Sequence, residues 1–408
     1  MKSKILLAHP GTQHSHQLAS QLHLKGLLFE FHTGIAFGED HWLYSLLRKI
    51  PGPFFNLLSK RFVPLIPDKF IKRKLWLELL TLLFIKSKFN SELILNIRNS
   101  IFQKIISSKS LKGSDAIIGF DTSSHILIKR AQKLRIPFIL DVSIAHPIEK
   151  KHIYQDLIKR YPEWGFNVAI KNEKSLNREQ FEMDHADFLV VASSFTYKTY
   201  IKHGINANKI IVNPYGVDCN YFTANIPKPI KDKINFVFVG LVDVRKGIPL
   251  LLNAWRKINK DHATLTLIGP IDDTTKEKIK QSDLEIKIKN KISLIELSQI
   301  LPSFDVMVFP SFFEGFGLVV LEAMACGLPV ITTNATCGSD VISNHIDGIL
   351  INNNIEEELI ESMSYFINNS DQIYKMGKLA RKKAEDFNWN TYGERWNQSL
   401  REILSNFK

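Results

Sequence analysis

Cysteine is scarce in this chain of 408 residues, which contains only Cys219, Cys326 and Cys337. The three form no Cys-x-x-Cys pair and stand at no zinc-ligand spacing with histidine. So sparse and odd a count excludes a disulfide framework and fits a reducing compartment. Long apolar runs are also missing, because no stretch reaches the roughly 18 residues that a membrane-spanning helix needs. We expect no spanning helix and, since the first apolar run is short, no signal peptide.

Acidic residues are scarce in one block of the chain. Residues 42–112 contain 14 Lys and Arg but only 3 Asp and Glu, and this block accounts for nearly all of the net charge of +12. Its segment 75–85 is apolar almost all round. Three interpretations stay open: extra helices with a solvated basic face, a surface for an anionic membrane, or a site for an anionic polysaccharide or nucleic acid. No nucleic-acid motif occurs, so we expect no nucleic-acid partner.

Short apolar runs alternate with helical stretches along most of the chain, which is typical of buried parallel strands. The pattern predicts an α/β fold with two Rossmann-like, doubly wound domains. We place them at residues 1–214, including the basic helical block 42–112, and at 215–387, with a linker near 225–233. A helix is expected at 387–407. The expected strands lie at residues 2–10, 115–120, 137–142, 187–193, 209–214, 234–240, 264–269, 305–309, 329–333 and 348–351.

The segment 310–330, PSFFEGFGLVVLEAMACGLPV, contains the strongest functional signal. It follows a strand and contains Glu314, a Gly-Phe-Gly loop at 315–317, and an apolar helix with Glu322. A helix N-terminus preceded by glycines leaves N–H groups free for a phosphate. A carboxylate can accept two hydrogen bonds from a vicinal diol of a sugar or ribose. These features together predict a nucleotide-sugar site.

Two adjacent cations, Arg245 and Lys246, precede a helix in the same half of the chain. Cations in a loop before a helix N-terminus can neutralise a diphosphate, and arginine can bind it through two parallel hydrogen bonds. No G-x-G-x-x-G motif follows any strand, so a nicotinamide dehydrogenase is not expected.

The run PS-x-x-EGFG-x-x-x-LEAMA-x-G-x-PV strongly resembles the donor site of the family 4 retaining glycosyltransferases of GT-B fold. The resemblance implies that Glu322 holds the ribose, that Glu314 binds the donor sugar near the reacting carbon, and that Arg245 and Lys246 grip the diphosphate. It further implies a donor-binding loop, in which backbone N–H groups of Gly315, Phe316, Gly317 and Leu318 contact sugar and phosphate.

In the N-terminal half the resemblance points to the loop HPGTQHSHQLA at 9–19, where Gly11 lets the diphosphate approach. The histidines of this loop have no acidic or cysteine partner at metal-ligand spacing, so we expect no metal there. His146 follows the strand at 137–142, which is where the family has a histidine in the active site. We expect His146 to bind the donor sugar and to stabilise the charged transition state.

The resemblance therefore implies a glycosyltransferase that retains the anomeric configuration, needs no metal or other cofactor, and uses a nucleotide-diphosphate sugar as donor. The helix at 388–408 would cross back onto the N-terminal domain. We expect a glycan or lipid-linked acceptor, a role in cell-surface polysaccharide or lipopolysaccharide synthesis, and a cytoplasmic location. Contact of block 42–112 with the inner face of the cell membrane is one of its three open interpretations. The alternatives are a GT-B sugar-nucleotide epimerase and a catalytically silent scaffold of a glycan-assembly complex.

Overall fold

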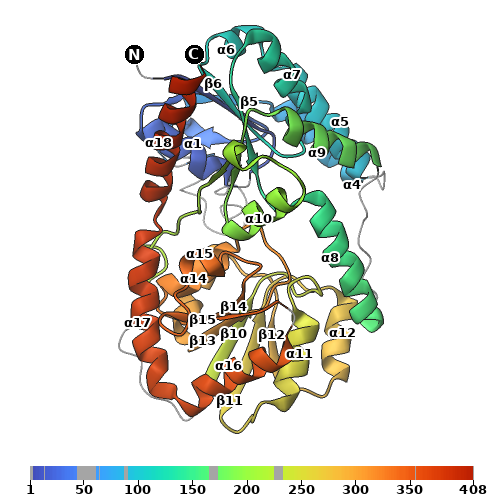
Figure 1. Ribbon diagram of the computed structural model, residues 1–408, viewed down its shortest axis with the longest axis vertical. Helices are drawn as coiled ribbons and strands as arrows, with labels where there is room; N and C mark the ends of the chain where they lie inside the picture. The colour runs from blue at the N-terminus through green and yellow to red at the C-terminus, as the bar shows by residue number, and fades with distance from the viewer. Residues whose placement is uncertain are drawn as a thin grey trace.

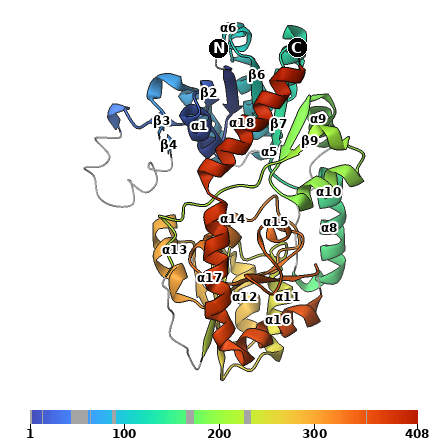
Figure 2. The same ribbon diagram turned by 60° about the vertical axis from the view of Figure 1, so that its left-hand side comes forward.

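The chain folds into two parallel α/β units stacked one above the other, with the last helices running along one side of both (Figures 1 and 2). The computed structural model describes residues 3–12, 14–43, 61–63, 65–86, 91–164, 173–224, 233–353 and 355–407. Within these residues no helix combines the length and the apolar character that crossing a bilayer requires.

The N-terminal unit is built on a seven-stranded parallel sheet with the order β5-β2-β1-β6-β7-β8-β9. Small strands β3 and β4 pair separately. Its elements are β1 (Ile5–His9), α1 (Ser15–Leu24), β2 (Leu28–Thr33), β3 (Phe37–Gly38), β4 (Phe62–Val63), η1 (Asp68–Phe70), β5 (Ile71–Arg73), α4 (Leu75–Lys86), α5 (Ser91–Lys104), α6 (Ser108–Lys112), β6 (Ala116–Phe120), α7 (His125–Leu134), β7 (Phe138–Val142), α8 (Pro147–Arg160), η2 (Pro162–Trp164), α9 (Glu173–His185), β8 (Phe188–Val191), α10 (Ser194–Lys202), η3 (Ala207–Lys209) and β9 (Ile210–Val212).

The C-terminal unit is built on a six-stranded parallel sheet with the order β12-β11-β10-β13-β14-β15. Its elements, with the helices that close the chain, are β10 (Ile234–Val239), α11 (Ile248–Lys257), β11 (Ala263–Ile268), α12 (Asp273–Gln281), β12 (Ile286–Lys289), α13 (Leu294–Ile300), η4 (Leu301–Ser303), β13 (Val306–Phe309), α14 (Leu318–Ala325), β14 (Val330–Thr333), α15 (Gly338–Val341), β15 (Gly348–Ile351), α16 (Glu356–Asn368), α17 (Ser370–Asp386) and α18 (Trp389–Asn406).

Each sheet reverses its strand order once, between β1 and β6 in the first sheet and between β10 and β13 in the second. Ligands of doubly wound folds bind beside the carboxyl ends of the strands at such a switch point. The central strands carry apolar side chains on both faces because helices cover both faces, and β13 and β14 are buried throughout. The fold class expected from the sequence is confirmed.

Helix α18 returns to the N-terminal unit and packs against α1 (Figure 2). Lys25, the C-cap residue of α1, pairs with Glu394 of α18 at 2.5 Å. At the start of α18 the backbone of Val217 bridges to Asn388, and a Cβ on Gly216 would lie 2.5 Å from the amide nitrogen of Trp389. Glycine is therefore needed at position 216 because two backbones approach closely there.

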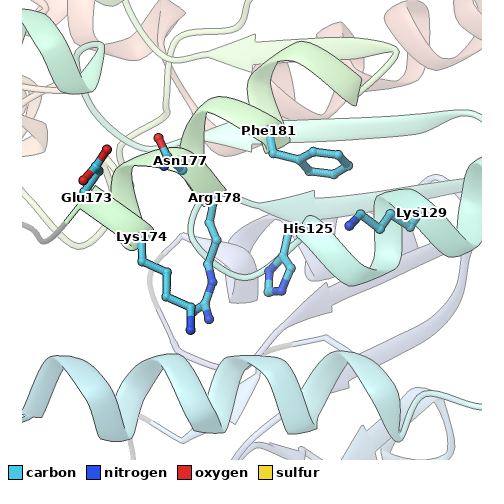
Figure 3. A pocket seen from close by; sticks show the side chains of 7 residues that line it. All are labelled: His125, Lys129, Glu173, Lys174, Asn177, Arg178 and Phe181. Carbon is cyan, nitrogen blue, oxygen red and sulfur yellow. The ribbon is translucent and has the colours of Figure 1, made fainter.

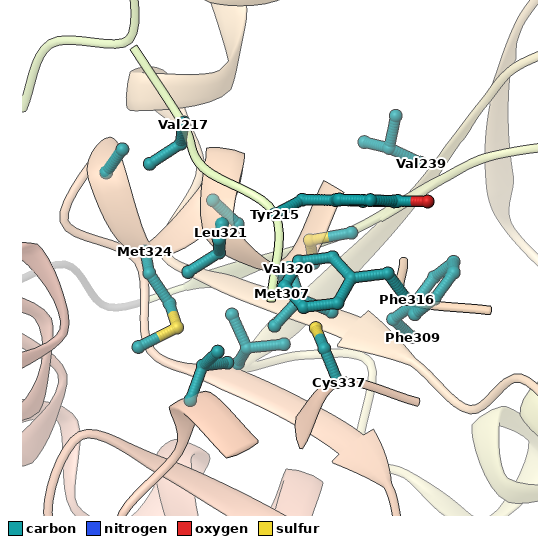
Figure 4. Packing of buried hydrophobic residues seen from close by; sticks show 14 of the residues in the cluster. Tyr215, Val217, Val239, Met307, Phe309, Phe316, Val320, Leu321, Met324 and Cys337 are labelled. Carbon is teal, nitrogen blue, oxygen red and sulfur yellow. The ribbon is translucent and has the colours of Figure 1, made fainter. Parts of the chain in front are cut away.

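One continuous cluster of buried side chains reaches from the C-terminal sheet to the segment that joins the two units (Figure 4). Phe309 and Met307 of β13 pack in this cluster with Val320 and Leu321 of α14. Tyr215 lies in the same cluster, with its ring 5.1 Å from that of Phe316. The donor-binding loop is thus fixed to both the sheet below it and the connecting segment.

The ten strands expected from the sequence are confirmed as β1, β6 to β11 and β13 to β15. Five of the described strands were not predicted: β2, β3, β4, β5 and β12. Helices expected in block 42–112 are confirmed as α4, α5 and α6, but β5 adds an edge strand in the middle of that block. Residues 44–60, 64 and 87–90 of the block, and 225–232 of the expected linker, lie outside the described residues.

Candidate active site

The donor-binding loop connects β13 to α14 and stands at the switch point of the C-terminal sheet. Gly317 is the N-cap of α14 and has a φ of 92°, a left-handed conformation that side chains other than glycine rarely adopt. Within the described residues, the amide N–H groups of Gly317, Leu318 and Val319 have no hydrogen-bond acceptor. The start of α14 therefore has free N–H groups, the feature with which a helix N-terminus binds an anion, and binding of a phosphate there stays a prediction.

Glu314 lies at the centre of a buried charge cluster beside this seat. Its Oε1 accepts hydrogen bonds from Lys246 Nζ at 2.5 Å, from Arg245 at 3.0 Å and from the Ser311 hydroxyl at 2.7 Å. Arg245 also donates to the carbonyl of Phe313 at 3.1 Å. The structure thus brings Glu314 next to Arg245 and Lys246, which lie about 70 positions earlier in the chain. The sequence analysis assigned all three residues to one site.

Two cations, Arg245 and Lys246, share the carboxylate of Glu314, and Asp243 adds a second carboxylate beside them. Burial lowers the pKa of Lys246, although Glu314 opposes that effect. Burial likewise raises the pKa of Asp243, whose carboxylate accepts the backbone N–H of Lys246 at 2.9 Å. Cations that have been desolvated in this way bind a diphosphate more strongly than cations in water.

Glu322 lies one turn into α14 and is half-buried. Burial raises the pKa of its carboxyl to about 7. No hydrogen bond reaches this carboxyl from any residue that the structure describes. A half-buried carboxyl with no partner next to a phosphate seat suits the diol of a ribose.

The N-terminal unit meets the donor-binding loop at Gly315. The hydroxyls of Ser193 and Thr196, at the start of α10, donate to the carbonyl of Gly315 at 2.7 and 3.1 Å. On its other side, a Cβ on Gly315 would overlap the carbonyl oxygen of Ser143. Gly315 is thus enclosed by two loops of the N-terminal unit, an arrangement that only glycine permits.

A second contact between the units lies beside the first. The backbone N–H of Ser194 donates to both carboxylate oxygens of Asp340 at 3.0 and 3.1 Å. A carboxylate at the N-terminus of α10 also interacts favourably with the helix dipole. The sequence analysis did not identify Ser193, Thr196 or Asp340. The sequence signal that was available for this contact is the Ser-Ser pair after strand β8, because serine is a common N-cap residue.

His146 lies in the loop between β7 and α8 and caps α8, its Nδ1 accepting the N–H of Ile148 at 3.3 Å. Its imidazole is buried and stacks on His203 at 4.6 Å, with Tyr200 at its edge. Burial lowers its pKa to about 4. The loop of His146 touches the donor-binding loop through Ser143, but the ring itself packs against α10. Its catalytic role stays a prediction.

The loop after β1 stands at the switch point of the N-terminal sheet. A Cβ on Gly11 would lie 2.9 Å from Nε2 of His9, so the loop folds tightly over that ring. His14 pairs with Asp141 at the end of β7 at 3.0 Å and also hydrogen-bonds the Tyr215 hydroxyl at 3.0 Å. Tyr215 in turn contacts Phe316, so His14 is linked to the donor-binding loop. The pair of His14 and Asp141 was not foreseen, because 127 residues separate its members.

Two other groups of polar side chains lie apart from the charge cluster around Glu314. A hollow of about 520 Å³ between α7 and α9 is lined by His125, Lys129, Arg178 and neighbouring side chains (Figure 3). Glu149, His152 and His203 are the one group in the described part of the chain with atoms close enough to share a metal ion. Neither grouping includes a residue that the sequence assigned to the donor site.

Comparison with solved structures defines the class of fold. Sucrose-phosphate synthase from Thermosynechococcus elongatus superposes with a TM-score of 0.67 over 99% of this chain and 100% of that one, at 18% identity. The HepE protein of Anabaena in complex with UDP gives a TM-score of 0.66 over 98% and 100% of the two chains, at 15% identity. The protein has the GT-B fold.

Comparison of sequences narrows the class. Residues 223–383, in the C-terminal unit, match the family model described as Glycosyl transferases group 1. The D-inositol 3-phosphate glycosyltransferase of Paenarthrobacter aurescens is 29% identical over 56% of this chain and 60% of its own length. A capsular polysaccharide biosynthesis glycosyltransferase of Staphylococcus aureus is 28% identical over 49% and 57%. The match spans little more than half of these relatives, and it does not favour the epimerase or scaffold alternatives.

Proposed function

We propose that the protein transfers a glycosyl group from a nucleotide-diphosphate sugar to a glycan or lipid-linked acceptor. The observation that carries this proposal is the charge cluster of Arg245, Lys246 and Glu314 beside the open N-terminus of α14. Cations and free N–H groups that converge on one point match a diphosphate leaving group. The relatives in polysaccharide and inositol phosphate glycosylation support the same class of reaction.

The diphosphate binds between the N–H groups at the start of α14 and the side chains of Arg245 and Lys246. Its negative charge competes with Glu314 for both cations, which frees the carboxylate of Glu314 to accept hydrogen bonds from the donor sugar. Glu322 accepts the ribose hydroxyls. As the bond from the anomeric carbon to the phosphate oxygen breaks, the cations stabilise the charge that grows on the leaving group.

The acceptor hydroxyl attacks the anomeric carbon from the side of the N-terminal unit, and its proton passes to the departing phosphate oxygen as the new glycosidic bond forms. We infer retention of configuration from the resemblance of segment 310–330 to the retaining family. Two cations already balance the diphosphate, so the reaction proposed here uses no metal ion. We place the enzyme in the cytoplasm, at the inner face of the cell membrane, in the synthesis of cell-surface polysaccharide or lipopolysaccharide.

Calorimetric titration of the full chain with UDP, GDP and ADP, each compared with its own monophosphate, tests the donor site. A fold neighbour was solved with UDP-glucose, so UDP is the first choice. We expect one nucleoside diphosphate to bind at least about tenfold more tightly than its monophosphate, because only the diphosphate reaches both cations. EDTA should leave this affinity unchanged. Failure of all three diphosphates to bind would overturn the proposal.

A further inference from the structure

The paired helices α4 and α5 expose an unusual amount of apolar surface. They lie side by side on the N-terminal unit, and only their inner sides reach its core, through Leu77 and Phe102. Leu83 is 66% exposed and Trp76 is 51% exposed. Further large apolar side chains on these two helices are at least one-third exposed: Leu79, Leu80, Leu82, Phe84, Ile85, Leu93, Leu95 and Ile97. A patch of this kind on a folded protein marks a surface that binds a partner protein or a membrane.

A groove of about 420 Å³ runs between the two helices. Trp76, Leu80 and Phe84 line it from one turn to the next on α4, and Leu93, Ile97 and Ile101 do so on α5. The Thr81 hydroxyl also lines the groove, but it donates to the carbonyl of Leu77 within its own helix at 2.7 Å. The walls therefore offer almost no polar partner, and a hydrocarbon chain suits them.

Among the described residues that line this groove, Arg98 is the one that carries a charge, and it lies on the side facing the protein. It pairs with Glu78 at 3.2 Å, and the side chain of Glu78 fills the space next to Gly34 and the carbonyl of Pro10. The positive charge of Arg98 is also close enough to add to the effect of burial in lowering the pKa of His9. The inner end of the groove is therefore next to the loop after β1, at the switch point of the N-terminal sheet.

The charge of the surrounding residues decides between two partners that would cover this surface, a second copy of the chain and a lipid bilayer. The block 42–112, which contains both helices, carries 14 basic and 3 acidic residues. Lys72, Arg73 and Lys74 directly precede α4. In a symmetric dimer this surface would face its own copy and bring like charges together, which is unfavourable. A bilayer with anionic head groups satisfies both the apolar side chains and the basic ones.

We propose that the outer sides of α4 and α5 insert into an anionic lipid bilayer and that the groove between them takes a hydrocarbon chain of one of its lipids. The proposal stands on the surface alone and does not require the donor site. If the proposed function also holds, a chain in the groove would bring its head group toward the loop after β1. The acceptor would then be lipid-linked rather than a free glycan.

Quenching of tryptophan fluorescence by vesicles tests the groove. The full chain is mixed with equimolar phosphatidylglycerol and phosphatidylcholine vesicles whose chains carry bromine. We expect strong quenching that weakens in high salt and that falls at least about twofold in Trp76→Phe, since contact with the lipid chains is local. Trp164→Phe, a change outside α4 and α5, serves as the matched control and should keep the quenching. Equal quenching of Trp76→Phe and wild type would overturn the proposal.

Vesicle flotation of two leucine variants tests the outer surface. Leu83→Asp should lower the fraction bound at least about tenfold, whereas Leu379→Asp, on the exposed side of α17, should not. Binding of UDP should be the same in both, so a defect in the donor site would be recognised separately. Three results would contradict the proposal: equal flotation of both variants, a lipid-free dimer that Leu83→Asp dissociates, or a Trp76 emission that does not respond to vesicles.

Discussion

Helices α7 and α14 occupy equivalent places in the two units, yet their N-termini differ. Each follows the strand next to the first strand of its sheet, β6 in one case and β13 in the other. The N-terminus of α7 is closed by Glu182, a buried residue of α9 whose carboxylate accepts the N–H groups of Thr122, Ser124 and His125 at 2.6 to 2.8 Å. The N-terminus of α14 has no such partner among the described residues.

The difference shows how one fold can hold a ligand in one half only. A helix N-terminus attracts anions because its first N–H groups have no partner within the helix. In the N-terminal unit a side chain of the protein satisfies that need permanently. In the C-terminal unit no described side chain satisfies that need, and the proposed function assigns it to the donor diphosphate. Glu322 stands beside the open end without a hydrogen-bond partner in the described structure.

The largest effect on nucleotide affinity is expected when one of the two cations beside α14 is removed. Lys246→Ala should weaken the binding of a nucleoside diphosphate by about 100-fold, because a charge-assisted hydrogen bond in a buried site is lost. Lys257→Ala, which removes an exposed lysine from α11 of the same unit, is the matched control and should bind as wild type does. Calorimetric titration measures both, and equal affinities would remove Lys246 from the donor site.

Gly315→Ala tests whether the N-terminal unit must close over the open helix end. The new Cβ would collide with the carbonyl of Ser143, so the two units should separate slightly. We expect kcat for transfer to fall by about 10- to 100-fold, as a catalytic site that needs closure is left open. Nucleotide affinity should change little. An unchanged kcat would show that this contact is not part of the working state.

Glu322→Gln tests the unpartnered carboxyl through the pH dependence of binding. The pKa of Glu322 is raised to about 7 by burial, and only the ionised form accepts both ribose hydroxyls. Wild-type affinity for the nucleotide should therefore rise between pH 6 and pH 8. The variant should show no such rise and bind about tenfold more weakly at pH 8. Parallel pH profiles for the two proteins would rule out the ribose role.

Glu182→Gln should have the smallest effect on the donor site, with nucleotide affinity unchanged. Burial raises the pKa of Glu182 to about 8, above its ordinary value of 4.5. The stability that this shift contributes is complete below pH 4.5 and is lost as the pH rises through 8. Wild-type Tm should fall between pH 5 and pH 9 by about 2–4 °C more than the Tm of the variant. Scanning calorimetry at several pH values measures that difference.

The sequence was most informative where function depends on a short stretch of chain. In segment 310–330, Glu314, Gly317 and Glu322 are fixed relative to one another by a loop and a helix, so their order along the chain predicts their arrangement. Strand β2, by contrast, was missed because polar Glu30, His32 and Thr33 interrupt its apolar residues. These residues pair with each other or lie buried in the sheet, which no local pattern shows.

For His146 the sequence identified the loop but not the direction of the ring. A histidine after a strand end can face the cleft or turn back to cap the next helix, and local sequence does not distinguish the two. Packing against Tyr200 and His203, more than 50 residues away, determines the direction. The closing contacts of Ser193 and Thr196 with Gly315 were missed for the same reason, since they join opposite units of the protein.

The sequence by itself determined the two α/β units, the donor-binding loop and the basic block, because each depends on residue types and spacings within one short stretch. Only the tertiary structure decided which helix N-terminus stays open, which cations share Glu314, and how the two units meet at Gly315. These outcomes depend on side chains that approach from distant parts of the chain. Their physical cause is the same throughout: a buried polar group must find a partner, and the fold determines whether that partner is the protein or a ligand.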